Sequence, residues 1–411
     1  MSDAFTIAAL PKIVFGCGVL DQLPGEIKRF GSRALMVTGA TSFTRSNAWT
    51  RLQGQLDDAG VTYTRLGIPG EPSPEAVDAA VTSYKDEDFD AVVGIGGGSA
   101  LDAAKAIAGL LKPGNTVMDH LEGVGPEHPY LGPATPFIAV PTTAGAGSEA
   151  TKNAVLSRHG ADGFKKSFRH EALVARVAMV DPDLLQTCSK PQVAANGMDA
   201  FTQLLESIVS TRSNAMTEAL AWSGMDRFAQ GFWDMWLAAP DTPETVGGGG
   251  LDNPRDDQRA RDARAHMAYA ALQSGVCLAQ TGLGSVHGLA QPLGSLFPIP
   301  HGVVCGTLVA DAVDINIRAL IQRNPGSEAL GHYARAGQVL AGGVSGNDAL
   351  DALVRTLKDW TERLELPRLS AFGVREADVD AIVANSRGSS MLTNPATLTD
   401  AEIAELVRRR L

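Results

Sequence analysis

Residues 1–185 alternate short runs of β-branched and apolar residues with longer helical patterns. This alternation is typical of parallel strands joined by crossover helices. From residue 186 onward, apolar residues recur three or four positions apart, which indicates helices. At 411 residues the chain also exceeds what a single hydrophobic core usually serves. The sequence therefore predicts an α/β domain with a parallel sheet over 1–185 and an all-α domain over 186–411. The predicted strands are 33–39, 61–67, 90–98, 136–141 and 177–182.

Charge and composition restrict the partners of such a chain. The net charge of −11 makes nucleic acid or an anionic membrane an unfavourable partner, because binding either requires basic surface. No apolar run is long enough to span a membrane, and the first residues lack the pattern of a signal peptide, so we expect a cytoplasmic protein with small-molecule ligands. The four cysteines are scattered, and we expect them to be reduced and mostly buried. They are Cys17, Cys188, Cys277 and Cys305.

One segment interrupts the helical half. Residues 239–262 carry four consecutive glycines, prolines and dense charge. Such a composition is too polar to bury and too flexible to hold one shape, so it predicts a surface loop between helices.

A glycine-rich turn joins the third predicted strand to a helix in "VVGIGGGSALDAAK". Glycines allow a ligand to approach the backbone closely, and the first amides of a helix favour an anion such as a pyrophosphate. A tight turn explains a single loop of this kind about as well. The candidate cofactor residues in this segment are Gly96, Gly97, Gly98, Ser99 and Asp102.

A second loop of small residues, "PTTAGAGSEAT" (141–151), follows the next predicted strand and offers the hydroxyls of Thr142 and Thr143. Open parallel sheets bind ligands at the carboxyl ends of their strands. Two such loops in one domain therefore predict a crevice for a dinucleotide, NAD or NADP.

The first predicted strand ends in Gly39, where an acidic residue would bind the ribose hydroxyls of NAD and repel a 2′-phosphate. Without that carboxylate we expect NADP to be accepted, with Arg45 near enough in sequence to help. A simple turn glycine is the alternative interpretation.

A candidate metal site lies in the helical half. Asp199 and Gln203 are four residues apart and would share one helix face. An amide binds divalent transition metals less well than imidazole or carboxylate. His287 and His301 lie in one glycine-rich segment, "GLGSVHGLAQPLGSLFPIPHG" (282–302), where a lone histidine is more often structural. Two histidines together with Asp199 favour a shared site.

These segments occur in an order and spacing that resemble the iron-containing (group III) alcohol dehydrogenases. The resemblance runs from "PKIVFGCGVLDQLP" to "TNPATLTDAEI", which is nearly the whole chain. It implies a Rossmann-like dinucleotide-binding domain and a helical domain, the architecture that dehydroquinate synthase also has. It further implies a homodimer or larger homo-oligomer and hydride transfer between NAD or NADP and a small alcohol or aldehyde.

The resemblance also implies residue roles. The family holds a divalent metal, Fe²⁺ or Zn²⁺, through one Asp and three His, and these positions are Asp199, His287, His301 and Gln203 here. A further family histidine near the nicotinamide corresponds to Gln291. Both departures replace His by Gln, so we expect weaker metal binding and a proton route through another group. The implied cofactor contacts are Gly97, Gly98, Ser99, Asp102, Thr142, Thr143 and Lys165.

Three alternatives remain open on the sequence alone. The first is a metal-independent dehydrogenase of the same fold, in which His287 and His301 bind the substrate oxygen. The second is a lyase similar to the sugar-phosphate cyclases, although the segments around Asp199 and His287 are almost free of cations. The third is a non-catalytic nucleotide-binding protein.

Overall fold

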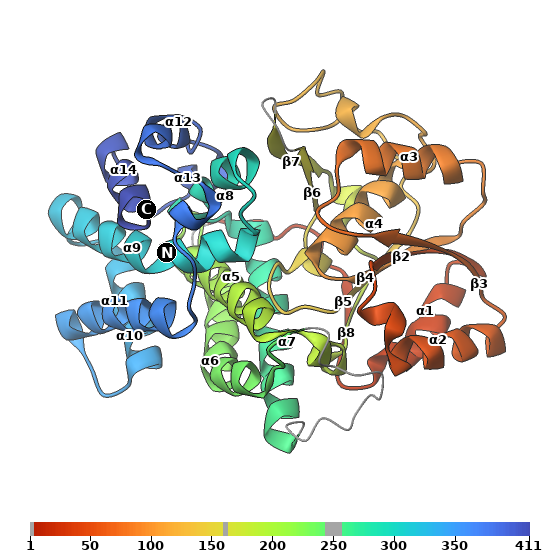
Figure 1. Cartoon of the computed structure of the whole chain (residues 1–411), viewed down its shortest axis with the longest axis horizontal. Coiled ribbons are helices and arrows are strands. Elements are labelled where there is room, and N and C mark those ends of the chain that lie inside the picture. Colours follow the sequence, from red (N-terminus) through yellow and green to blue (C-terminus); the bar gives the residue numbers. More distant parts are fainter. Residues whose placement is uncertain (1–3, 159–162, 243–256) are drawn as a thin grey trace.

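The computed structural model of the chain describes residues 4–158, 163–242 and 257–411 and contains a sheet part and a helical part (Figure 1). Six parallel strands form one sheet in the order β1-β8-β5-β4-β2-β3, and every strand predicted from the sequence belongs to it. The strands are β1 (Lys12–Phe15), β2 (Arg33–Gly39), β3 (Thr62–Ile68), β4 (Ala91–Gly96), β5 (Phe137–Pro141) and β8 (Val177–Val180).

Both faces of the sheet are covered by helices, as expected for parallel strands joined by crossovers. In β2, Leu35 and Val37 belong to one buried cluster with α3 and α4, whereas Ala34 and Met36 belong to another with α1 and α2. Figure 1 shows these two helix pairs on opposite sides of the sheet. The predicted α/β fold class is confirmed. The helices are α1 (Leu23–Lys28), α2 (Asn47–Asp58), α3 (Pro74–Tyr84) and α4 (Gly98–Leu110).

Two features of the sheet part were not predicted from the sequence. β1 is a four-residue edge strand with mostly exposed residues, and its apolar run of three residues is too short to mark a buried strand. The antiparallel pair β6 (Asn153–Arg158) and β7 (Phe164–Arg169) is only half buried and has a weak apolar pattern. This hairpin packs against α4 and α8 and so links the sheet part to the helical part.

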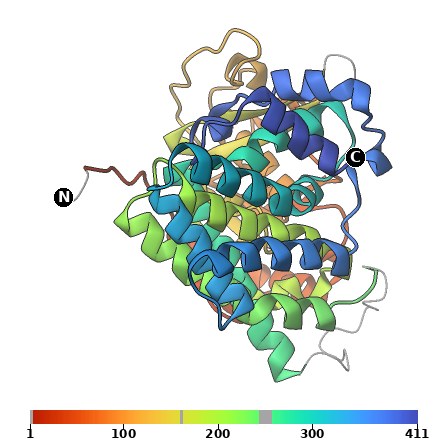
Figure 2. The ribbon, with the colours of Figure 1, turned by 90° about the vertical axis from the view of Figure 1, so that its left-hand side faces the viewer.

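The remainder of the described chain is helical, as the apolar periodicity predicts. Figure 2 shows these helices stacked in layers, with the C-terminal ones (blue) nearest the viewer. The helices are α5 (Lys190–Val209), α6 (Ala215–Ala238), α7 (Gln258–Thr281), α8 (Ser285–Leu296), α9 (His301–Arg323), α10 (Glu328–Ala341), α11 (Gly346–Arg363), α12 (Val379–Ala384), α13 (Ser389–Leu392) and α14 (Asp400–Arg409).

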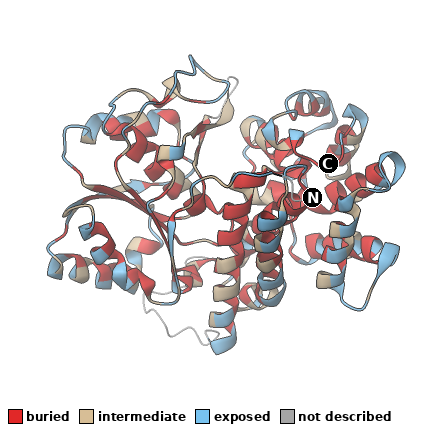
Figure 3. Cartoon of the chain, turned by 180° about the vertical axis from the view of Figure 1, so that it is seen from behind, coloured by how far each residue is buried: buried red, intermediate tan, exposed pale blue. Residues whose placement is uncertain are grey.

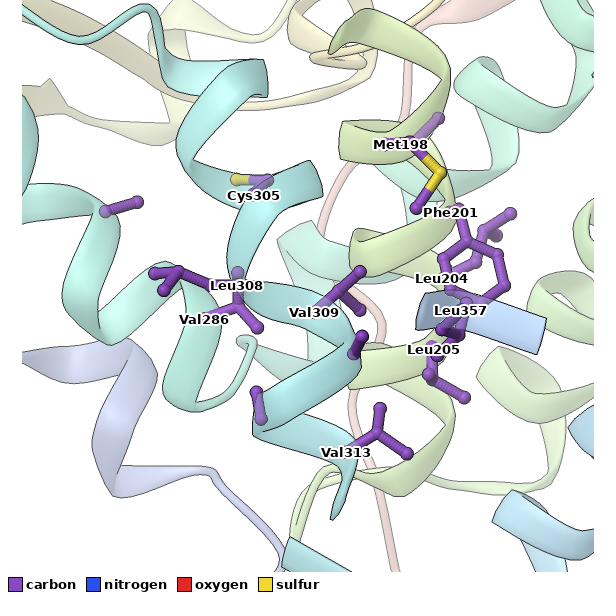
Figure 4. Packing of buried hydrophobic residues seen from close by; sticks show 14 of the residues in the cluster. Met198, Phe201, Leu204, Leu205, Val286, Cys305, Leu308, Val309, Val313 and Leu357 are labelled. Atoms are coloured by element: carbon purple, nitrogen blue, oxygen red, sulfur yellow. The ribbon is translucent and has the colours of Figure 1, made fainter. Parts of the chain in front are cut away.

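Helix α5 lies at the centre of the helical part. It is apolar on nearly all sides, and its residues from Gly197 to Val209 are buried. Figure 4 shows Phe201 and Leu205 of α5 in the same buried cluster as Val309 and Val313 of α9. Figure 3 shows the same concentration of buried residues along the central helices and the sheet. Burial on all sides fixes α5 firmly, so the polar side chains that it carries hold defined positions.

The glycine-rich segment predicted as a loop joins α6 to α7, and residues 243–256 of it lie outside the described residues. The four cysteines are free thiols; Cys17 is exposed and the other three are buried, as expected. Within the described ranges, no helix combines the length and apolar character needed to cross a membrane.

Candidate active site

A cleft of about 1060 Å³ lies between the carboxyl ends of the strands and the helical part. The chain order reverses at β2, which pairs with β3 on one side and β4 on the other. Such a switch point is where open α/β sheets bind their ligands. Most predicted site residues line this one cleft. They are Gly97, Gly98, Ser99, Asp102, Thr143, Lys165, Asp199, Gln203, His287 and His301.

The two glycine-containing loops meet at the cleft. A Cβ atom added to Gly97 would lie 3.3 Å from the side chain of Thr143, and one added to Gly98 would lie 3.2 Å from Ala146. Gly97 is also the N-cap of α4 and offers that helix no side-chain cap. Only a residue without a side chain leaves this helix end open to an anion.

The other three predicted cofactor residues, Gly39, Gly96 and Thr142, lie next to the residues that line the cleft. Gly96 ends the buried strand β4, and its carbonyl accepts the backbone N–H of Thr142 at 2.9 Å. A Cβ atom on Gly96 would lie 3.2 Å from the backbone nitrogen of Gly39. The ends of β2, β4 and β5 are therefore packed closely together, and Gly96 and Thr142 shape the loops rather than line the cleft.

A buried lysine ties the first loop to the second. Lys105 of α4 is fully buried, and its Nζ donates to the Ser148 carbonyl at 2.8 Å and the Asn153 carbonyl at 2.6 Å. Ser148 Oγ in turn donates to Asp102 Oδ1 at 2.5 Å. Burial raises the pKa of Asp102 and lowers that of Lys105. Lys105 therefore holds Asp102 and the second loop in fixed positions at the cleft.

Four potential metal-ligating side chains converge at the opposite side of the cleft, from three different helices; three of them line the cleft, and Cys305 lies buried behind them. Asp199 lies on α5, His287 on α8, and His301 with Cys305 on α9. One ligand atom from each lies within 4.8 Å of the others. His287 Nε2 is 3.2 Å and His301 Nε2 is 3.7 Å from Asp199 Oδ1. The predicted ligands Asp199, His287 and His301 are thus brought together.

A buried glutamate, Glu206 of α5, orients His287. Its Oε2 accepts the ring Nδ1 of His287 at 2.7 Å and the backbone N–H of Gly284 at 2.9 Å. Its Oε1 accepts the backbone N–H of Val286 at 2.7 Å. A proton held on Nδ1 leaves Nε2 as the free ligand atom, facing Asp199, which is a common arrangement behind metal-binding histidines.

The burial of these groups shifts their ionisation. Burial opposes protonation of His287, but Cys305, Asp199 and Glu206 outweigh it and raise the pKa of His287 well above its ordinary value. For His301, burial dominates and lowers the pKa to about 4, which leaves a neutral imidazole. Burial would raise the pKa of Asp199, but the two histidines hold it below its usual value. Asp199 and His301 are thus in the ionisation states that bind a divalent cation, whereas His287 must first release the proton on Nε2.

The two glutamines that replace family histidines also face the cleft. Gln203 Nε2 donates to Asp199 Oδ1 at 3.1 Å, and its Oε1 accepts Ser274 Oγ at 2.7 Å. In this orientation the amide supports the carboxylate as a hydrogen-bond donor. Gln291 lines the cleft four residues after His287. Lys165 of β7 lines it as well, and its Nζ lies 2.7 Å from Glu71 Oε1.

Sequence analysis missed Glu206 and Cys305. Helical spacing could have indicated both: Glu206 lies seven residues after Asp199, and Cys305 lies four residues after His301. These intervals place Glu206 on the same helix face as Asp199, and Cys305 on the same helix face as His301. Lys105 was also passed over, because a lysine on a helix is ordinarily solvent-exposed.

Comparisons with known proteins agree with this geometry. Residues 11–182 match the family model described as iron-containing alcohol dehydrogenase, and residues 250–411 match that of the C-terminal part of the Fe-containing family. A long-chain-alcohol dehydrogenase of Geobacillus thermodenitrificans is 33% identical over 288 residues, 70% of this chain and 67% of its own. The NAD-dependent methanol dehydrogenase of Bacillus methanolicus is 28% identical and covers 98% of both chains.

A solved structure shows the same fold. The archaeal halo-thermophilic Red Sea brine pool alcohol dehydrogenase superposes with a TM-score of 0.84 at 24% identity, over 100% of this chain and 99% of its own. A two-part chain with a dinucleotide crevice facing an Asp–His–His cluster defines a nicotinamide-dependent dehydrogenase of the metal-containing type. The chain belongs to the iron-containing alcohol dehydrogenase family. It is an oxidoreductase that acts on the CH–OH group of small alcohols or, in the reverse direction, on the carbonyl of aldehydes. The predicted family, activity and cofactor class of NAD(P) with a divalent metal are confirmed.

Proposed function

We propose that this chain interconverts a small alcohol and its aldehyde at the described cleft, with Asp199, His287 and His301 holding a divalent metal. The observation that carries the proposal is the convergence of these three side chains on one point in the wall of the cleft that the glycine loops also line. The donor set fits such an ion, because one carboxylate oxygen and two imidazole nitrogens suit iron and zinc. The buried His301 Nδ1 has no hydrogen-bond partner, so this ring is held mainly by what binds its Nε2.

When bound, the ion would polarise the substrate oxygen as a Lewis acid, and the nicotinamide would give or take the hydride. The chain contributes orientation and exclusion of water. Glu206 holds His287 with its Nδ1 protonated, and Asp102 is fixed beside the open end of α4 by Lys105 and Ser148. Gln291 can donate or accept a hydrogen bond at the cleft but exchanges no proton near neutral pH, so water or another group carries the proton.

The substrate is proposed to be uncharged or weakly polar. Apolar side chains from α7, α8 and α9 line the cleft together with the metal candidates; among them are Leu278, Ala290 and Val303. Lys165 also reaches the cleft but is paired with Glu71. A wall of this kind supports an aliphatic alcohol better than a diacid.

For the cofactor, we propose binding at the loops 96–99 and 141–148, with NADPH accepted at a rate comparable to or better than NADH. A Cβ atom on Gly39 would meet no other atom within 4 Å, so the position beside Gly96 is open. Gly39 itself carries no carboxylate to repel a 2′-phosphate. Two further predictions stay untested: the division into domains at 185/186 and a homodimer or larger assembly.

One observation favours the metal-independent alternative. Asp199 Oδ1 lies 3.1 Å from Gln203 Nε2 and 3.2 Å from His287 Nε2, so hydrogen bonds alone can satisfy this carboxylate. In this alternative His287 and His301 bind the substrate oxygen directly, which requires His287 Nε2 to share or exchange its bond to Asp199. Family membership argues against the lyase and the non-catalytic alternatives, since neither is an oxidoreductase.

The test compares metal content with aldehyde reduction. Purified protein is assayed for metal, chelated, reloaded with ferrous iron or zinc, and tested on a panel of aldehydes with NADPH and NADH. We expect activity to fall on chelation and to recover on reloading. We expect Asp199→Ala and His287→Ala to lose both metal and activity, and Gln203→His to retain metal better. Equal rates in the chelated and reloaded samples, with no metal in either, would establish the metal-independent enzyme instead.

A further inference from the structure

A thiol lies among the proposed metal ligands. Cys305 follows His301 by four residues on α9, so both project from one face of that helix. Its Sγ lies 3.5 Å from His287 Nε2 and 3.8 Å from His301 Nε2. The residue is fully buried and lies near the N-terminal end of α9, where Figure 4 labels it among the buried residues. The thiol therefore lies within reach of an ion held by the other three residues, and a substrate oxygen would then enter as a fifth ligand.

The separations between these donor atoms fit a tetrahedral site. With metal–nitrogen and metal–oxygen bonds near 2.05 Å and a metal–sulfur bond near 2.3 Å, a tetrahedron has nitrogen–oxygen edges of about 3.4 Å and nitrogen–sulfur edges of about 3.6 Å. The observed nitrogen–oxygen separations are 3.2 and 3.7 Å. The observed nitrogen–sulfur separations are 3.5 and 3.8 Å. These four of the six edges lie within about 0.3 Å of the ideal values, and the nitrogen–nitrogen and oxygen–sulfur pairs lie within 4.8 Å, so a modest adjustment of the side chains would enclose an ion.

The amide at position 203 is engaged elsewhere. Gln203 Oε1 accepts Ser274 Oγ, and its Nε2 points toward Asp199. Turning the amide over would place its oxygen beside the ionised carboxylate, an unfavourable contact in the absence of a cation. As placed, the amide turns its NH₂ group toward Asp199, and the oxygen that could bind an ion faces Ser274.

We propose that Cys305 is the fourth metal ligand of this chain, and that a set of Asp199, His287, His301 and Cys305 selects zinc or another thiophilic divalent ion over ferrous iron. The inference rests on the proposed function, since it presupposes a metal at the other three residues. A thiolate is a soft ligand that favours zinc, whereas carboxylate and imidazole alone discriminate less. Binding converts the thiol to a thiolate, and the proton leaves to solvent.

Cobalt(II) provides a direct test, because a thiolate ligand gives it an intense near-ultraviolet charge-transfer absorption. Protein freed of metal is titrated with Co²⁺, followed by absorbance and by calorimetry. We expect the band to rise to one equivalent in the unmodified protein and to be absent in Cys305→Ser, which keeps size and burial. The matched control is Cys277→Ser, another fully buried thiol, which lies outside the cluster and is 3.5 Å from the Thr217 carbonyl. This control should retain the band.

A second measurement addresses selectivity. Protein equilibrated anaerobically with equal free zinc and ferrous iron should carry mainly zinc, and Cys305→Ser should lower the zinc-to-iron ratio by roughly tenfold. Cobalt bound at one equivalent without the charge-transfer band in the unmodified protein would overturn the assignment of Cys305 and leave the three-ligand metal site standing. No cobalt bound by calorimetry would overturn both. The two failures are therefore distinguishable.

Discussion

Replacing Glu206 by glutamine should weaken metal binding without touching a metal ligand. Glu206 accepts three N–H groups with its two oxygens, from Gly284, Val286 and the ring of His287. A glutamine offers one acceptor oxygen and one NH₂ group. If its oxygen keeps the bonds to His287 and Gly284, its NH₂ faces the N–H of Val286; the opposite orientation loses two bonds instead of one.

The expected magnitude follows from this count. Losing one hydrogen bond to a charged acceptor costs about 1.5–3 kcal/mol, so the free energy of unfolding should fall by roughly 2 kcal/mol. A neutral amide also polarises the Nδ1–H of His287 less than a carboxylate does, which makes Nε2 a poorer ligand. Replacing the hydrogen-bond partner of a metal-binding histidine typically weakens metal affinity by roughly 10–100-fold, and we expect the effect of Glu206→Gln to fall in that range.

The assay is calorimetric titration of metal-free protein with zinc, alongside circular dichroism to confirm the fold. Asp102→Asn is the control: it alters another buried carboxylate, bound to Ser148 and Val155 on the cofactor side, and should leave zinc affinity unchanged. A folded Glu206→Gln protein whose zinc affinity stays within about threefold of the unmodified protein would refute the role assigned to Glu206.

Three further predictions concern the sheet part. Gly97→Leu should abolish NAD(P)H binding measured by calorimetry, because even its Cβ atom would lie 3.3 Å from Thr143; unchanged binding would contradict the proposed loop. Gly39→Asp should shift the ratio of NADH to NADPH turnover toward NADH, and a strong NADH preference already present in the unmodified protein would show that other residues decide it. Burial raises the pKa of Glu149 from 4.5 to about 7, so its contribution to stability is present below pH 4.5 and lost as the pH rises through 7. At about 1.4 kcal/mol per pKa unit this amounts to roughly 3 kcal/mol. In urea unfolding, the free energy of unfolding of Glu149→Gln should therefore change less between pH 5 and pH 8 than that of the unmodified protein. Glu328→Gln, at an exposed site, should show the same change as the unmodified protein.

The sequence was sufficient for features that depend on local pattern. Strand runs such as 90–98 are apolar enough to be buried on both faces, and glycines at their ends mark the turns that the cleft needs. Asp199, His287 and His301 were predicted jointly because the family's motifs carry them. Their convergence depends on the packing of α5, α8 and α9, and one chain's periodicity specifies helices but not which helix faces meet.

The features that were missed are those defined by a partner far away in sequence. Lys105 resembles an ordinary surface lysine until the hairpin β6–β7 covers it and supplies the Asn153 carbonyl. Glu206 resembles a solvated helix residue until Gly284 and Val286 present their N–H groups to it. A buried charge is stable only where such partners exist. Local sequence pattern does not specify these partners, so it cannot predict that a charged side chain will be buried.

Two buried carboxylates also support the proposal that this site binds a cation. Asp199 and Glu206 flank His287, at 3.2 Å and 2.7 Å from its two ring nitrogens. Two negative charges at this depth need compensation. Without an ion, a protonated His287 provides one positive charge, which agrees with its raised pKa. A divalent ion provides two, and it takes the place of the proton on Nε2 while Glu206 keeps the proton on Nδ1. With Cys305 a thiol in the first state and a thiolate in the second, the cluster carries the same net charge of −1 in both states, so the fold should survive chelation even though the binding site for the substrate oxygen changes.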